Sequence, residues 1–154
     1  MRLNRAILTL LTLTVFALAI TSPATAGVVG CKKVLATLDT LVVEDSVEVG
    51  EVYGTIDGAV YLRYDDTAPP IDPRTARPNF VITSKLGTIN LWVYSATEMS
   101  GDGWWRDFEI LRSEGTGTYA KQRIILEIYG KCSPKDGHYE IEGMICPPIV
   151  PPKK

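Results

Sequence analysis

Histidine, cysteine and catalytic motifs are scarce in this chain of 154 residues. His138 is its single histidine, and with no second histidine and no cysteine beside it in the sequence it makes a poor metal site. A Ser-His-Asp triad would have to use His138, yet no Gly-x-Ser-x-Gly motif occurs. We therefore expect no metal and no cofactor, and we expect His138 to be solvated beside a turn.

The chain also lacks a strong charge of either sign and, outside its N-terminus, a long apolar run. Its formal net charge of −2 gives no reason to expect a nucleic-acid partner. A membrane-spanning helix needs about 20 consecutive apolar residues, so we expect no membrane span in the mature chain. The length suggests one domain.

The first 26 residues have the organisation of a cleaved signal peptide. Arg2 and Arg5 precede an apolar run from Ala6 to Ile20, and Ala24-Thr25-Ala26 fits the small-x-small rule of signal peptidase. The alternative is an uncleaved anchor helix, for which the apolar run is short. We expect cleavage after Ala26 and export to the periplasm or the extracellular space.

Three cysteines, Cys31, Cys132 and Cys146, lie in the predicted mature part. Export favours disulfides, and an odd count leaves one thiol over. Val28-Val29-Gly30-Cys31 resembles the lipobox of bacterial lipoproteins. A lipid anchor on Cys31 combined with a Cys132–Cys146 bridge is therefore one alternative.

Strand geometry disfavours that alternative. If Cys132 faces His138 across a hairpin turn, Cys146 lies eight residues further on, or about 26 Å away at about 3.3 Å per residue. A disulfide needs Cα atoms within about 7 Å. The last strand of a closed antiparallel barrel pairs with the first, which would bring Cys146 near Cys31. We predict a Cys31–Cys146 disulfide, which excludes lipidation of Cys31 and leaves Cys132 as a thiol or for an intermolecular bond.

The stretch Phe80–Tyr94 gives the clearest structural signal. Two runs of β-branched and aromatic residues flank Ser84-Lys85-Leu86-Gly87, a turn that ends in glycine, as a β-hairpin with a positive φ requires. The second run alternates an apolar face with a face of polar and large aromatic groups, as the wall of a small barrel or sandwich does. The apolar face comprises Ile89, Leu91 and Val93.

The rest of the chain predicts further strands and no convincing helix. Asp57-Gly58 between two alternating runs favours a second hairpin over one long strand bent by glycines. Lys32–Thr40 stays ambiguous, because its apolar residues have helical spacing in a short, uncapped run. Residues 65–78 carry four prolines, which exclude a central strand.

Seven or eight strands with regularly spaced turn signals predict an all-β fold. We expect a single antiparallel β-barrel of about eight strands, with a β-sandwich as the alternative. The chain then divides into a signal peptide (1–26), an N-terminal segment (27–40), a barrel domain (41–146) and a proline-rich tail (147–154).

Three short pieces resemble the barrel superfamily of plant allene oxide cyclases and dirigent proteins, with its small exported bacterial relatives. They are Gly54-Thr55-Ile56-Asp57-Gly58, Phe80-Val81-Ile82-Thr83 with Leu86-Gly87-Thr88-Ile89, and Gly115-Thr116-Gly117-Thr118-Tyr119-Ala120. In that family a glycine-punctuated strand, a strand pair with a Gly-Thr-Ile turn and a Gly-Thr-Gly-x-aromatic turn follow in the same order. The resemblance implies an eight-stranded barrel of this or a calycin-like kind with an apolar cavity, and it carries over no catalytic residue.

Candidate site residues are few. Asp107 and Glu109 share a strand face about 7 Å apart, which would suit paired carboxylates if that face pointed into an apolar cavity. Outward-facing surface acids are the plainer interpretation. Large aromatic residues could line a pocket for an apolar or sugar-like ligand, or could simply belong to the core and rim. These aromatic residues are Trp92, Tyr94, Trp104, Trp105 and Tyr61.

The sequence therefore predicts a small exported barrel that binds a small apolar ligand or an envelope partner without catalysis. One alternative is an isomerase or cyclase that steers a reactive intermediate in an apolar cavity. Another is a structural or interaction protein that uses its edge strands and its proline-rich tail.

Overall fold

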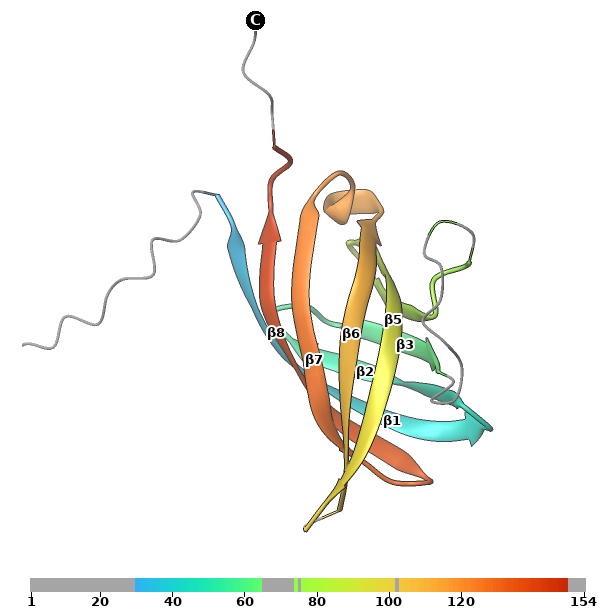
Figure 1. Ribbon diagram of the computed structural model, residues 1–154. Coiled ribbons are helices and arrows are strands. Elements are labelled where there is room, and N and C mark those ends of the chain that lie inside the picture. Colours follow the sequence, from blue (N-terminus) through green and yellow to red (C-terminus); the bar gives the residue numbers. More distant parts are fainter. Residues whose placement is uncertain (1–29, 65–73, 75, 102, 150–154) are drawn as a thin grey trace, which may run out of the picture.

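The computed structural model describes residues 30–64, 74, 76–101 and 103–149, and these form a closed barrel of antiparallel strands (Figure 1). The strands are β1 (Lys32–Glu44), β2 (Val47–Gly54), β3 (Gly58–Arg63), β4 (Phe80–Ser84), β5 (Gly87–Ser100), β6 (Gly103–Gly115), β7 (Arg123–Cys132) and β8 (Asp136–Cys146), and a short 3₁₀ turn, η1 (Gly117–Tyr119), links β6 to β7. In the described part of the chain, no helix is long and apolar enough to cross a membrane.

Each strand pairs with the next, and β8 pairs with β1 to close the barrel. The closing ladder runs from Lys32 opposite Ile145 to Leu41 opposite Asp136. Closure satisfies the backbone groups that two open sheet edges would expose. The prediction of a single eight-stranded antiparallel barrel is confirmed, and the sandwich alternative is wrong.

The first strand begins earlier than the sequence analysis placed the barrel. The predicted N-terminal segment covers residues 27–40, but β1 starts at Lys32. Val34 and Leu38 point inward and are buried, whereas Leu35 and Leu41 are exposed outside. The helical spacing of the apolar residues therefore arises because both faces of one strand carry them.

Both predicted hairpins are present. β4 and β5 form the central hairpin, with Ser84 opposite Gly87. Gly87 has a φ of 139°, and a Cβ there would lie 2.2 Å from the carbonyl oxygen of Thr116. β2 and β3 form the other hairpin, but three residues, 55–57, join them where Asp57-Gly58 suggested a two-residue turn.

Side chains fill the middle of the barrel. Phe80 of β4 meets Phe108 of β6 edge to face at 5.8 Å between ring centroids, and Phe108 meets Tyr139 of β8 in the same way at 5.2 Å. These three rings thus extend across the interior, and aliphatic side chains from every strand pack around them. The resemblance implied an apolar cavity, but at this level the described side chains occupy that space.

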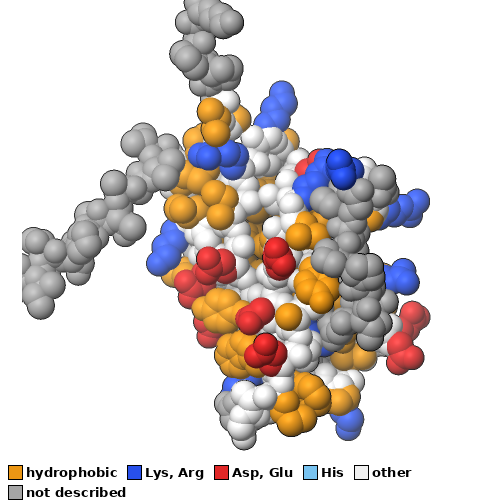
Figure 2. All heavy atoms as spheres, in the orientation of Figure 1, with side chains coloured by type: hydrophobic (Ala, Val, Ile, Leu, Met, Phe, Trp, Pro, Cys, Tyr) orange, Lys and Arg blue, Asp and Glu red, His pale blue; other side chains and the backbone are white. Residues whose placement is uncertain are grey.

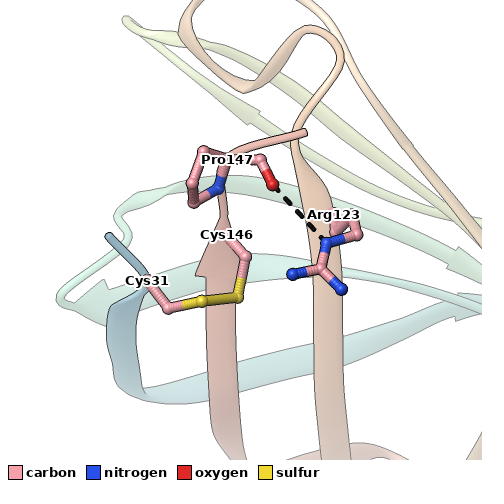
Figure 3. Close-up of a disulfide and its surroundings, with 4 residues drawn as sticks. All are labelled: Cys31, Arg123, Cys146 and Pro147. Atoms are coloured by element: carbon pink, nitrogen blue, oxygen red, sulfur yellow. Dashed lines mark hydrogen bonds between the residues drawn. A yellow bond between two sulfur atoms is a disulfide. The ribbon is translucent and has the colours of Figure 1, made fainter. Parts of the chain in front are cut away.

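The termini of the barrel are joined by the predicted disulfide. Cys31, just before β1, bonds to Cys146 at the end of β8 (Figure 3). Beside it, the Arg123 side chain donates a hydrogen bond to the carbonyl oxygen of Pro147 (3.5 Å). Cys132 keeps its thiol. The bridge uses the sulfur that a lipid anchor would need, so the lipidated form is incompatible with this structure.

The predicted signal peptide lies outside the described residues.

Candidate functional site

The two ends of the barrel differ. The Cys31–Cys146 bridge lies at one end, and the tip of the β5–β6 hairpin lies at the other (Figure 1). We call the second end the mouth; the β1–β2, β5–β6 and β7–β8 turns form it. Two features lie at the mouth: a buried ion pair inside the barrel and a cavity beside it.

The ion pair joins Glu48 of β2 to Arg106 of β6. One guanidinium nitrogen of Arg106 lies 2.8 Å from a Glu48 carboxylate oxygen, and the two side chains are only 0% and 6% exposed. The Nε of Arg106 donates to the hydroxyl of Thr97 at 3.0 Å, and its guanidinium lies 3.7 Å from the centre of the Tyr64 ring. A buried charge is stable only when it is paired and hydrogen-bonded, and here both conditions hold.

Hydroxyl groups complete the coordination of Glu48. Thr40 donates to its Oε2 at 2.5 Å, and the Tyr139 hydroxyl lies 3.1 Å from the same oxygen. Burial raises the pKa of Tyr139 far above its usual range, and the Glu48 carboxylate raises it further. Tyr139 therefore stays protonated and donates to Glu48, while it accepts from Arg106 at 3.2 Å. We call Thr40, Glu48, Thr97, Arg106 and Tyr139 the buried polar cluster.

The buried polar cluster is saturated. Every fully buried side-chain nitrogen and oxygen of the described residues has a hydrogen-bond partner. Glu48 faces a guanidinium and two hydroxyl groups, so both of its carboxylate oxygens are already engaged by protein groups. The arrangement is that of a structural cluster, which fixes β2, β6 and β8 relative to one another.

Sequence reasoning missed this cluster. A signal was present, because Glu48 shares the inward face of β2 with Val52, and Arg106 shares the inward face of β6 with Phe108. Strand alternation places each charge on an apolar face, but it does not show that the two residues meet. They are 58 positions apart in sequence, and barrel closure brings them together.

The mouth cavity has a volume of about 630 Å³ and lies next to the buried polar cluster, with Thr40 belonging to both. Trp104 is 43% exposed in its wall. His138 and Asp39 also line it, and the His138 Nδ1 contacts an oxygen of Asp39. The cavity is lined by Asp39, Thr40, Gly103, Trp104, Lys131, Cys132, Ser133, Asp136, Gly137 and His138.

Of the five aromatic candidates, Trp104 alone lines the mouth cavity. Trp92 is buried on the outer side of β5, where its indole N–H donates to the carbonyl oxygen of Ala76 at 2.8 Å. Trp105 stacks on Tyr129 outside the barrel with ring centroids 6.4 Å apart. The remaining two, Tyr61 and Tyr94, alternate with buried neighbours and also face outward. The structure therefore does not bring the five together.

The candidate carboxylates Asp107 and Glu109 both lie on the outer wall and are exposed. Between them, Phe108 points inward. Both side chains border a surface cavity of about 370 Å³ whose lining also includes apolar residues, and their role as a catalytic pair stays a prediction. His138 has a side chain that is 65% exposed, which agrees with the expected solvated position beside the β7–β8 turn.

Comparison with known proteins found no match for this chain among protein-family models, curated proteins or solved structures. The resemblance noted in the sequence is thus supported at the level of architecture, an eight-stranded antiparallel barrel. Membership of the allene oxide cyclase and dirigent superfamily stays a hypothesis.

Proposed function

We propose that this protein is an exported, non-enzymatic binding module that holds a small ligand in the mouth cavity. The observation that carries the proposal is the position of Trp104, a large aromatic ring left 43% exposed in a cavity of about 630 Å³. Ligand pockets commonly combine an aromatic wall with a few polar groups that fix orientation. The mouth cavity has this composition.

The lining indicates the class of ligand. The ring of Trp104 offers a flat apolar surface, and Asp39, Lys131 and Asp136 offer charged hydrogen-bonding groups around it. A ligand that fits has one flat apolar face and several hydroxyl groups, as a sugar ring does. The expected ligand was apolar. The proposed ligand also carries polar groups, because the cavity wall around the indole ring of Trp104 is polar.

The filled interior favours the mouth over the centre of the barrel. The Phe80, Phe108 and Tyr139 rings occupy the space in which a barrel carrier would hold its ligand. The isomerase or cyclase alternative has less support, because it needs an available ionisable group inside the barrel. Glu48 and Arg106 are committed to each other, and Asp107 and Glu109 face outward.

Two observations support export. Residues 1–26 have the pattern of a signal peptide. The Cys31–Cys146 disulfide fits an oxidising compartment, in which such bonds persist. The periplasm or the extracellular space is therefore the proposed location.

The test uses the exported, disulfide-bonded protein. Its native mass is first compared with its denatured mass, since a difference of one small molecule would reveal a retained ligand. Neutral disaccharides such as cellobiose and maltose are then titrated while the indole N–H signals are followed by NMR. We expect a disaccharide to shift the Trp104 signal, and we expect Trp104→Ala to abolish the response.

Trp105→Ala is the matched control, because the neighbouring Trp105 lies outside the cavity and should leave binding intact. Equal loss in both variants would contradict a site at the mouth. So would native and denatured masses that agree, together with an indole signal of Trp104 that no probe shifts.

A second candidate function is binding of an envelope partner through the outer wall. Leu41, Val49 and Tyr61 lie opposite one another across β1, β2 and β3. They form an exposed apolar row, with exposed fractions of 64%, 37% and 44%. This row replaces the edge strands that the sequence suggested for interaction, because the closed barrel pairs every strand on both sides.

A further inference from the structure

Positively charged side chains gather at the end of the barrel that carries the disulfide, opposite the mouth. Figure 2 shows Lys and Arg side chains (blue) around this upper end, where β8 ends, and acidic side chains (red) mainly lower on the wall. We call this the basic end, and it comprises residues 30–34, 54–58, 84–88, 113–125 and 143–149. Its cations are Lys32 and Lys33 at the start of β1, Lys85 in the β4–β5 turn, Lys121 after η1 and Arg123 at the start of β7.

Acidic groups are fewer at the basic end. Two acids, Asp57 and Glu114, stand there against the five cations. Glu114 is already paired with Arg112. The whole chain has a formal net charge of −2, so this excess of positive charge is local. An uneven charge distribution of this kind attracts an anionic partner to one end and orients the protein towards it.

Exposed apolar side chains stand among these cations. Leu86 follows Lys85 in the β4–β5 turn and is 54% exposed. Ile125 lies two positions after Arg123 and is 50% exposed, and Ile149 beyond the end of β8 is 72% exposed. Cations alone would suit any polyanion, whereas exposed apolar groups beside them suit the interface of a bilayer, where charged headgroups lie over acyl chains.

Hydrogen bonds hold the parts of the basic end in place. The backbone N–H of Thr118 donates to the carbonyl oxygen of Leu86 at 2.8 Å, and that of Thr116 donates to the carbonyl oxygen of Thr88 at 2.9 Å. These bonds fix the β4–β5 turn against η1. The disulfide and the hydrogen bond beside it join the ends of β1, β7 and β8, as Figure 3 shows. The charged surface is therefore preorganised, and binding need not first order it.

We propose that the basic end docks this protein on the surface of a lipid bilayer that contains anionic lipids. Its ammonium and guanidinium groups meet the lipid phosphates, while Leu86 and Ile149 enter the headgroup layer. Stable binding of this kind needs several cations together with buried apolar area, and the basic end offers both. In this orientation the mouth faces away from the membrane. The basic end shares no residue with the mouth cavity and does not depend on the proposed function.

The experiment uses the exported, disulfide-bonded protein and vesicles that are collected by centrifugation. Phosphatidylglycerol and phosphatidylcholine in equal parts give an anionic surface, and phosphatidylcholine alone gives a neutral one. We expect binding to the anionic vesicles only, and we expect it to weaken as salt is raised, because salt screens exposed charges. The double variant Lys85→Glu/Lys121→Glu should bind about tenfold or more weakly, since each cation near an anionic surface contributes about fivefold.

Two matched controls separate the basic end from the rest of the protein. Arg63→Glu/Lys135→Glu makes the same change in net charge at the mouth, where both residues are exposed, and should weaken binding far less. Leu86→Ser removes an apolar contact and should weaken vesicle binding several-fold. Met99→Ser is its control, because Met99 is 69% exposed near the tip of the β5–β6 hairpin at the mouth. Unfolding temperatures near that of the wild type would show that the variants fold.

Absence of binding to the anionic vesicles would overturn the proposal directly. So would equal binding to neutral vesicles, because apolar insertion, including that of an uncleaved N-terminal segment, would then account for it. Equal loss in the two charge-reversal variants would show that net charge decides, and not the basic end. An unchanged affinity of Leu86→Ser would also contradict docking on a bilayer, and tight binding of heparin, a sulfated polysaccharide, would then identify a site for polyanions.

Discussion

Arg106 and Glu48 form an ion pair at 2.8 Å inside a β-barrel whose remaining interior is largely apolar. Removing two charges from water costs several kcal/mol for each ion, and mutual attraction with added hydrogen bonds offsets that cost. Neither residue is stable there without the other. The pair therefore links β2 to β6 across the barrel. Unlike hydrophobic packing, this link requires both charged residues to be present.

Removing one partner should be far more damaging than removing both. We expect Arg106→Met or Glu48→Gln to lower the free energy of unfolding by about 3–5 kcal/mol, because each change removes one charge of a buried pair and leaves the other charge buried without it. The double variant Glu48→Leu/Arg106→Met should recover most of that loss, since apolar replacement of a buried pair is often neutral. Urea unfolding measures these values.

Glu51→Gln serves as the control on the same strand, because Glu51 is exposed and its loss should change the free energy of unfolding by about 0.5 kcal/mol or less. If Arg106→Met behaves like Glu51→Gln, the pair does not stabilise the barrel in the way described.

The raised pKa of Tyr139 predicts a loss of stability at alkaline pH. In the unfolded chain a tyrosine ionises near pH 10, whereas burial and Glu48 hold the folded-state pKa of Tyr139 well above that value. Above about pH 10 the unfolded state therefore binds fewer protons, and the free energy of unfolding falls by about 1.4 kcal/mol per pH unit for this group. Below pH 10 its contribution is fully present.

Urea unfolding between pH 8 and about pH 11.5 tests this dependence. Tyr139→Phe should make the decline shallower. The wild-type background includes Tyr129, whose pKa burial and hydrogen bonds to Glu142 and Glu140 raise to about 12, so the comparison of variants is needed to isolate Tyr139. An identical alkaline slope in Tyr139→Phe would refute the assignment.

Loss of the disulfide should destabilise the barrel strongly. Cys31 and Cys146 are 115 residues apart, so the bridge closes nearly the whole described chain into one loop. Chain-entropy arguments give about 4–5 kcal/mol for a loop of this length, and measured effects are commonly about 2–4 kcal/mol. We expect Cys31→Ala to lower the midpoint of thermal unfolding, and dithiothreitol to have little further effect on that variant.

Cys132→Ala is the control for this experiment, because Cys132 is not part of the bridge. It should leave one disulfide by mass and should unfold near the wild-type temperature. A bridge that survives in Cys31→Ala but disappears in Cys132→Ala would reverse the connectivity.

Strand periodicity made much of the fold predictable. Ile89, Leu91 and Val93 alternate with polar and aromatic residues, and all three are fully buried in the barrel. The Cys31–Cys146 bridge followed from one topological fact, the pairing of the last strand with the first. The same reasoning did not predict the strand at Lys32–Thr40. Its outer face carries apolar residues as well, so apolar and polar residues do not alternate with a period of two.

The sites were less predictable, because alternation assigns a residue to a face but not to a place on it. Trp104 and Trp105 are neighbours in sequence, yet one lines the mouth cavity and the other stacks on Tyr129 outside. Glu48 and Arg106 each had an inward position, but their contact depends on how far the strands are staggered around the barrel. Stagger is a property of the whole ladder and is not visible in any local pattern.

The three tryptophans should differ in access to a quencher, and this difference reports on the mouth cavity. Trp104 is 43% exposed, whereas Trp92 is 6% exposed and hydrogen-bonded to Ala76. In variants that keep one tryptophan and replace the others by phenylalanine, acrylamide should quench Trp104 several-fold more strongly than Trp92. A ligand bound at the mouth should then protect Trp104 and leave the quenching of Trp105 unchanged, because that ring lies on the outer wall. Equal quenching of Trp92 and Trp104 would mean that the mouth is closed in solution, and the cavity could not then receive a ligand.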